Sequence, residues 1–247
     1  MVAPAIICLC AGNLMSFDIA TVTACTALVC VVLSIIMEMF ARKQERFRGF
    51  GWLSVFYLAT GIGYGLIAMQ ENISGLFSIV AGTGLISLAF FFMHIGIEMF
   101  REIKSLFSWV HILFCAGIIT LTYIYSVNSS GFVHSVIPCN IIFSVQLILC
   151  ITALFRGKKI TRHMSKYVVA FPLGMMVLSF LISTAMIYHS PPQGVISNTG
   201  SLLTLPLFIS HLVMVVTALG FIWMSVNRAE QEKKILDAEL QDSLEKE

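Results

Sequence analysis

Histidines near the ends of two consecutive apolar segments are the residues of this sequence best suited to chemistry. His94 lies near the end of one segment and His111 near the start of the next, with a short basic connection between them. Such segments run antiparallel, so we expect both imidazoles at similar depth, where two facing histidines could bind a haem or a metal ion or report pH. The sequence has neither an HxxxH nor an HxxE pattern. We therefore favour histidines hydrogen-bonded to backbone or water, and we predict no metal and no cofactor.

Three acidic residues lie at the ends of apolar segments. Asp18 opens the first segment, whereas Glu38 and Glu98 lie near the ends of the first and third, close to Arg42 and Arg101. Ionisable groups are costly in hydrocarbon, which makes them functional candidates. For all three we favour solvation at the membrane surface or pairing with these arginines over a proton or ligand site.

Polar and aromatic residues in the outer halves of the segments, or at their outer rim, are candidates for binding a small-molecule signal. The alternative is the belt of aromatic and polar residues that lines a membrane surface. The candidates for a ligand or signal site are Asp18, Tyr64, Tyr123, His134, Asn140 and His189.

Catalytic patterns are missing from the sequence. It contains no phosphate-binding loop, no paired catalytic carboxylates and no nucleophile elbow. The seven cysteines lie almost wholly in apolar segments without a CxxC pair, and we interpret them as packing residues. We predict no catalytic residue, and the small net charge of +2 gives no support for nucleic-acid binding.

Composition and hydropathy indicate the elements that position these residues. The chain is 58% hydrophobic and 11% charged, with a mean hydropathy of +0.91. After an apolar lead-in, residues 1–16, this predicts an all-α, polytopic bundle of seven transmembrane helices in a lipid bilayer, residues 17–226, followed by a helical extension, residues 227–247. The predicted spans are Phe17–Phe40, Phe50–Met69, Leu76–Ile97, Leu106–Tyr125, Phe132–Phe155, Tyr167–Tyr188 and Leu202–Val226.

The basic residues predict the orientation of this bundle. All 15 Lys and Arg follow the first, third, fifth or seventh apolar segment, and the other three connections have none. Since positively charged loops stay in the cytoplasm, we expect the N-terminus outside and the C-terminus in the cytoplasm. Ligand recognition is then expected within the membrane or at its outer rim.

Small residues and a proline bear on how the helices pack and move. Glycines at 61, 63 and 65 and at 82 and 84 would let backbones approach closely. Pro206 frees a backbone carbonyl and tends to kink a helix, and His211 follows by little more than one turn. Pro206 and His211 are candidates for signal transmission, with an ordinary transmembrane proline as the alternative.

The last apolar segment passes without a break into a charged, helix-favouring one, 227–247. There Ala229, Leu236 and Leu240 have coiled-coil spacing, with Lys233 in the intervening core position. A parallel homodimer through Leu236 and Leu240 is one interpretation, and a solvated single helix is the other. We include both leucines among the candidates for signal transmission.

The layout resembles the seven-helix membrane sensor region that precedes GGDEF domains in many bacterial diguanylate cyclases. The similarity spans about residues 17–247. It is carried by Asp18 and by the segments ARKQERFRGFGW, HIGIEMFREIKS and FIWMSVNRAEQEKKILDAEL. The resemblance implies a bacterial inner-membrane protein whose last helix leads to a domain that condenses two GTP molecules into cyclic di-GMP.

Neither a GGDEF signature nor the Asp-Pro-Leu-Thr-Gly linker occurs here, so we expect the output domain to be absent from this chain. Enzymatic activity of a longer product stays open. The leading hypothesis is a sensory input module for a cytoplasmic output domain, in first place a diguanylate cyclase, and the alternatives are the input region of a histidine kinase and a transporter or channel subunit.

Overall fold

The computed structural model describes residues 19–43, 49–70, 72–103, 108–127, 132–156, 163–189, 200–244 and 246. These residues form seven α-helices and the turns between them, with no strand among them. The helices are α2 (Ile19–Lys43), α3 (Phe50–Ala68), α4 (Gly75–Phe100), α5 (Ser108–Val127), α6 (Phe132–Phe155), α7 (His163–His189) and α8 (Gly200–Leu244).

Each helix corresponds to one predicted span, and all of those described are long and apolar enough to cross a bilayer. A helix satisfies its own backbone hydrogen bonds, which hydrocarbon cannot do, so apolar runs of this length fold as spanning helices. The prediction of an all-α, multi-pass membrane protein is confirmed. The ends differ by a few residues: α2 continues past the predicted Phe40 to Lys43, and α7 begins before Tyr167 at His163.

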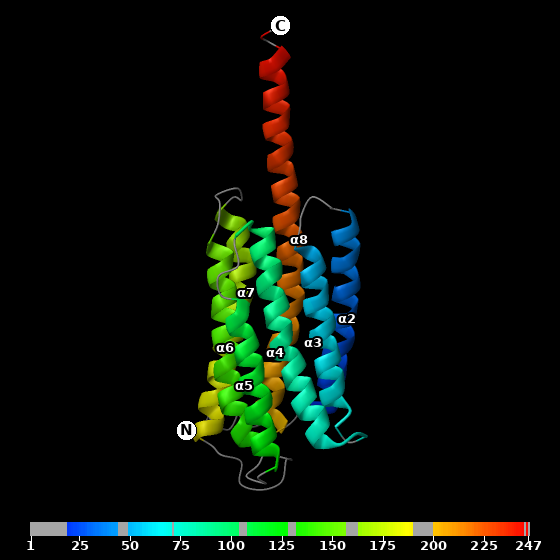
Figure 1. Ribbon diagram of the computed structural model, residues 1–247, viewed down its shortest axis with the longest axis vertical. Coiled ribbons are helices and arrows are strands. Elements are labelled where there is room, and N and C mark those ends of the chain that lie inside the picture. The colour runs from blue at the N-terminus through cyan, green and yellow to red at the C-terminus, as the bar shows by residue number, and fades with distance from the viewer. Residues whose placement is uncertain are drawn as a thin grey trace, which may run out of the picture.

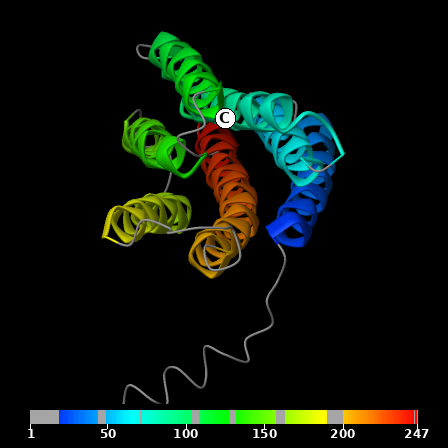
Figure 2. The same cartoon turned by 90° about the horizontal axis from the view of Figure 1, so that it is seen from below.

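The helices pack in chain order, each against the next, and α8 closes the bundle against α2 (Figure 1). In addition, α4 packs against α6, which lies two helices further along the chain. The view along the bundle shows α8 crossing it obliquely, from a start beside α7 towards its middle (Figure 2). This tilt brings the later part of α8 to the end of α4.

Glycines allow a close helix contact between α3 and α4. A Cβ atom added to Gly63 would lie 2.8 Å from the carbonyl oxygen of Gly82, and the reverse is also true. Gly61 faces the Ala27 carbonyl of α2 in the same way, at 3.0 Å. The predicted close approach of backbones is confirmed at these positions.

Aromatic rings extend across the interior of the bundle. Phe56 of α3, Phe90 of α4, Phe143 of α6 and Phe180 of α7 form a row, with successive ring centroids 6.2, 5.7 and 5.7 Å apart. These tilted pairs are favourable ring arrangements, and the Phe90–Phe143 pair fills the space between the non-consecutive helices α4 and α6. Packing in this row holds α4 and α6 side by side.

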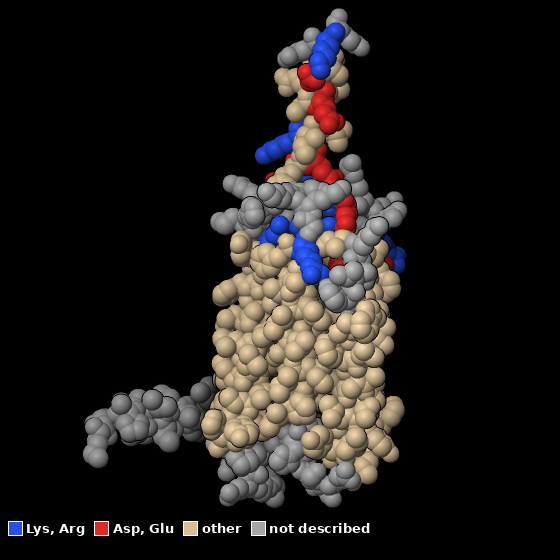
Figure 3. All heavy atoms as spheres, turned by 60° about the vertical axis from the view of Figure 1, so that its left-hand side comes forward, with Lys and Arg blue, Asp and Glu red and all other residues tan. Residues whose placement is uncertain are grey.

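The described lysines and arginines gather at one end of the bundle and on the extension of α8 (Figure 3). We call this end the basic end. There α2, α4 and α6 finish, and α8 continues beyond it as one helix to Leu244. The predicted helical extension is confirmed, while a coiled-coil partner stays a prediction.

Candidate functional site

Two histidines and a cysteine from three helices meet towards the basic end. The His94 ring of α4 and the His111 ring of α5 have centroids 4.7 Å apart. Cys150 of α6 joins them, and one potential ligand atom from each residue lies within 4.8 Å of the others. The three residues are 3%, 0% and 0% exposed, respectively. Antiparallel packing of α4 and α5 sets the histidines at equal depth, and packing of α4 on α6 adds the cysteine.

A buried carboxylate supports this cluster. Glu98 is 5% exposed and follows His94 by one helical turn, with its Oε1 3.2 Å from His94 Nε2. The other carboxylate oxygen accepts a hydrogen bond from Ser108 Oγ at 3.0 Å. The His94–Glu98 contact lies within ion-pair distance but does not have the geometry of a hydrogen bond. Neither ring nitrogen of His94 has a hydrogen-bond partner among the described residues.

The depth predicted for the two histidines is confirmed, and no backbone hydrogen bond to either ring is found in the part of the chain described, while hydrogen bonds to water stay a prediction. Both nitrogens of His111, like those of His94, are buried without a hydrogen-bond partner there. Two imidazoles bound across one haem iron would have centroids about 6 Å apart. The observed 4.7 Å leaves no room for a porphyrin between the rings.

At the end of α2, Glu38 pairs with Arg42 at 3.0 Å, as expected.

A small pocket of about 250 Å³ lies beside the cluster. His94, Glu98, Thr152 and Arg156 are its polar residues, and Leu149 and Ala153 of α6 provide most of its apolar wall. The pocket therefore leaves free space next to His94 and Glu98.

A second polar group of the basic end lies where α8 leaves the bundle. Arg228 donates from Nη1 to the Phe100 carbonyl at 2.8 Å, from Nη2 to the Glu102 carboxylate, and from Nε to Glu232 at 3.1 Å. Its guanidinium also lies over the Phe100 ring, 5.7 Å from the centroid. We call this set of contacts the Arg228 anchor. It joins α8 to the end of α4, the helix that carries His94.

A further arginine lies next to the anchor. Arg101 is buried, and its Nε donates to the Arg156 carbonyl at 3.0 Å. Burial, and then the positive charge of Arg228, lower the pKa of the Arg101 guanidinium. Arginine nevertheless stays charged at neutral pH, so two adjacent positive charges are held at this end by carbonyl and carboxylate oxygens.

Within the bundle α8 is bonded to two more helices. Tyr57 of α3 donates its hydroxyl to the Met214 carbonyl at 3.1 Å. His211 Nδ1 and Thr26 Oγ1 of α2 are 3.1 Å apart. Hydrogen bonds therefore fix α8 to α2 and α3 inside the bundle and to α4 at its basic end.

The predicted signal-site residues that the structure describes lie on four different helices. Tyr64 and Asn140 are buried, on α3 and α6, whereas Tyr123 is more than half exposed on α5 and His189 ends α7 at the surface. Neither the pocket beside Glu98 nor a groove between α4 and α5 includes any of these four. The ligand site at the outer rim stays a prediction. Two further candidates, Asp18 and the side chain of His134, lie outside the described residues.

The predicted transmission residues all belong to α8. His211 bonds to Thr26, as described, whereas Leu236 and Leu240 lie on the extension, 54% and 61% exposed. Pro206 falls within the helix, and its side chain lies outside the described part.

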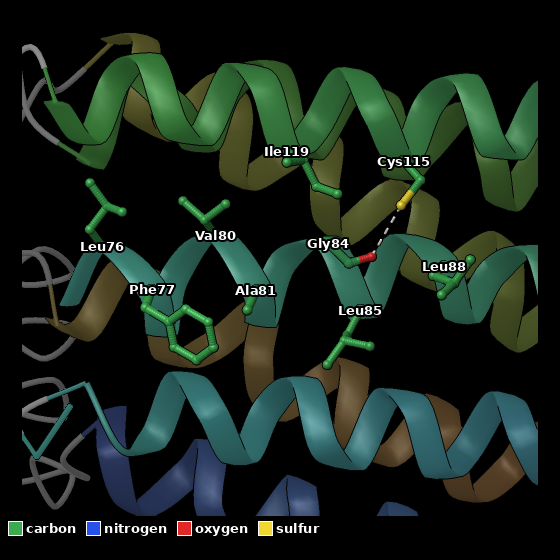
Figure 4. Close-up of a pocket in the computed structure, with 9 residues that line it drawn as sticks. All are labelled: Leu76, Phe77, Val80, Ala81, Gly84, Leu85, Leu88, Cys115 and Ile119. Carbon is green, nitrogen blue, oxygen red and sulfur yellow. Dashed lines mark hydrogen bonds between the residues drawn. The ribbon is translucent and has the colours of Figure 1, made fainter. Parts of the chain in front are cut away.

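An apolar groove of about 370 Å³ runs between α4 and α5 (Figure 4). Gly84 forms part of its floor, where the Cys115 thiol donates to the Gly84 carbonyl at 3.4 Å. Leu76, Phe77 and Ile119 are among the side chains around it. Its lining offers no charged group and no hydroxyl, so it lacks the oriented polar groups by which a pocket recognises a soluble signal molecule.

Sequence reasoning missed Cys150 and the role of Arg228. The cysteine was counted among seven packing residues, and its approach to the histidines depends on contact between non-consecutive helices. The arginine was counted only as a charge that orients the protein. Comparisons of the chain with protein-family models, curated proteins and solved structures give no match.

Proposed function

We propose that this protein is a membrane sensory input module that transmits a signal through α8 to a cytoplasmic output domain. The observation that carries the proposal is the continuity of α8, whose 45 residues run through the bundle and beyond its basic end. At 1.5 Å per residue such a helix is about 68 Å long. A rigid element of this length transfers a shift or rotation inside the bundle to whatever its far end contacts.

The contacts of α8 support this role. Tyr57 and Thr26 hold it within the bundle, and the Arg228 anchor holds it at the exit. The anchor involves a charged side chain, a backbone carbonyl and two carboxylates at a helix end, and such a polar set can adopt alternative pairings. Transmission requires an element of this kind with two arrangements.

The output is proposed from the resemblance to sensor regions of diguanylate cyclases, which also motivates a bacterial inner membrane as the location. The alternating basic connections support an N-terminus outside and an α8 extension in the cytoplasm. Exposed leucines on the extension, Leu236 and Leu240, would pair two copies of α8 and bring two output domains together. The signal is a small molecule of unknown identity.

The Arg228 anchor provides the test. The full chain is fused after Glu247 to a diguanylate cyclase catalytic domain, and cyclic di-GMP is measured in cells without other cyclases. We expect Arg228→Gln to change cyclic di-GMP by about fivefold or more, as typical coupling energies imply. The matched control is Lys234→Gln, which removes an exposed charge from the same helix, outside the coiled-coil spacing, and should leave the output unchanged.

Arg228→Lys separates charge from geometry, because lysine keeps the charge but lacks the forked donors. We expect it to behave like Arg228→Gln. Unmodified output from both Arg228 variants, at equal amounts of protein in the membrane, would contradict transmission through this anchor.

A further inference from the structure

We propose that His94, His111 and Cys150 form a binding site for a transition-metal ion of the zinc or copper class, with Glu98 as its buried carboxylate partner. This inference goes beyond the proposed function and does not depend on it. Three potential ligand atoms, from three different helices, already lie within 4.8 Å of one another.

A bound cation would give the imidazole nitrogens the partner that they lack. Their four ring nitrogens are buried, and none has a hydrogen-bond partner in the described part of the chain. An unsatisfied buried polar group costs about 1–3 kcal/mol, and such groups in a native protein indicate a missing partner. A metal ion accepts an electron pair from one nitrogen of each ring and so removes two of these unsatisfied atoms.

The donor types select the metal. Imidazole nitrogen suits zinc and copper, and thiolate sulfur favours Zn²⁺ and Cu⁺ over magnesium or calcium, which prefer oxygen. Cys150 would lose its proton on binding, because the thiolate is the ligand. With Zn²⁺, that thiolate and the Glu98 carboxylate leave the buried site without net charge.

Glu98 is placed as carboxylate partners of histidine ligands usually are. Its Oε1 lies 3.2 Å from His94 Nε2, while Ser108 holds the other oxygen. A carboxylate beside a metal-binding imidazole orients the ring and raises its basicity. Alternatively, it can supply a fourth ligand, because Zn²⁺ takes four in a tetrahedral site.

Entry and closure of the site are compatible with the packing. The pocket of about 250 Å³ lined by His94 and Glu98 leaves room for an ion beside the cluster. Donor atoms around zinc, with bonds of about 2.0–2.3 Å, lie about 3.3–3.8 Å apart, so the three ligands would close by about 1 Å. Side-chain rotation of this size does not require the helices to move apart.

The test measures metal binding by the full chain, purified in detergent under reducing conditions and freed of metal with a chelator. Zn²⁺ and Cu⁺ are each titrated in competition with a chromogenic chelator, and Co²⁺ is titrated as a spectroscopic substitute for zinc. We expect one equivalent per chain of Zn²⁺, Cu⁺ or both. Bound Co²⁺ should give a sulfur-to-metal charge-transfer band.

Variants assign the ligands. Cys150→Ser should abolish the charge-transfer band, and Cys150→Ser and His111→Gln should each weaken binding by more than the about 10–100-fold expected for Glu98→Gln. The controls are Cys139→Ser, a buried cysteine of the same helix outside the cluster, and His189→Gln, an exposed histidine. Both should bind as the unmodified chain does.

The charge-transfer band reports the sulfur ligand directly, and helical content by circular dichroism shows whether each variant is folded. Binding of only one of the two ions supports the site and identifies its metal. Absence of stoichiometric binding of Zn²⁺, Cu⁺ and Co²⁺ by the unmodified chain would overturn the proposal. Equal binding by Cys150→Ser and Cys139→Ser would overturn it as well.

Discussion

Single polar side chains, spaced through an apolar interior, tie neighbouring helices together. Ser34 of α2 and Ser54 of α3 each donate to the other's carbonyl, at 2.9 and 3.0 Å, and their hydroxyl oxygens are 3.1 Å apart. Gln146 of α6 bonds in a similar way to the side chain and backbone of Ser87 on α4. Hydrogen bonds of this kind in membranes contribute about 0.6 kcal/mol on average and up to about 1.7.

The reciprocal serine pair predicts a coupled effect on stability. Ser34→Ala and Ser54→Ala should each lower the free energy of unfolding by about 0.6–1.7 kcal/mol. The double variant should lose less than the sum of the two, because the two hydroxyl oxygens also lie 3.1 Å apart and either substitution removes this contact. Reversible unfolding in mixed micelles measures the three values. Strictly additive losses would show that the two hydroxyls act independently.

At the residue scale the sequence predicts part of the site. Its pattern places His94 and His111 at one depth, because consecutive helices joined by a short connection must be antiparallel. Cys150 could not be predicted in the same way. Its position depends on α4 packing against α6, and the apolar residues between them do not specify which helix faces which.

Among the elements, α3 and α4 approach each other closely at two glycines. At Gly63 and Gly82 each backbone lies against the other's carbonyl, so a side chain at either position would meet main-chain atoms that cannot rotate away. Glycine at these positions therefore serves helix contact. The sequence predicts this role because both clusters lie in apolar helices, where small residues mark helix interfaces.

This contact predicts a position-specific cost. Gly63→Ala should destabilise the protein by about 1–3 kcal/mol, since its Cβ would lie 2.8 Å from the Gly82 carbonyl oxygen. Gly117→Ala on α5 is the matched control, because a Cβ there meets nothing within 4 Å. Alanine also favours helix over glycine, so the control should be neutral or stabilising. Thermal unfolding in detergent compares them. Equal midpoints for the two variants would refute the close packing.

Over the whole molecule, the described charged residues lie at one end and on the extension of α8, and the rest of the face seen in Figure 3 shows none. The sequence predicts this arrangement because every Lys and Arg follows alternate spans. It also predicts the helical content and the continuous last helix. The tilt of α8 and the Arg228 anchor lie beyond sequence reasoning, because both arise from the fit of side chains between non-consecutive helices.

The charge distribution predicts orientation. A fluorescent protein fused after Glu247 should be bright in bacterial cells, and alkaline phosphatase at the same position should be inactive, because that enzyme matures only outside the cytoplasm. The reverse pair of results would place the basic end outside. Fusions after Val127, at the opposite end of the bundle, should give the opposite pair and serve as the control.

Transmission through α8 is tested most directly by rotating the part of the helix beyond the Arg228 anchor relative to the part within the bundle. One to seven alanines are inserted after Lys234 in the diguanylate cyclase fusion, and cyclic di-GMP is measured for each length. Each residue turns the helix by about 100°, so two alanines rotate the output by about 200°, whereas seven return it to within about 20°. We predict an output that varies with a period of about 3.5 residues and recovers at seven. An output that is constant, or that declines steadily with length, would contradict transmission by a rigid helix.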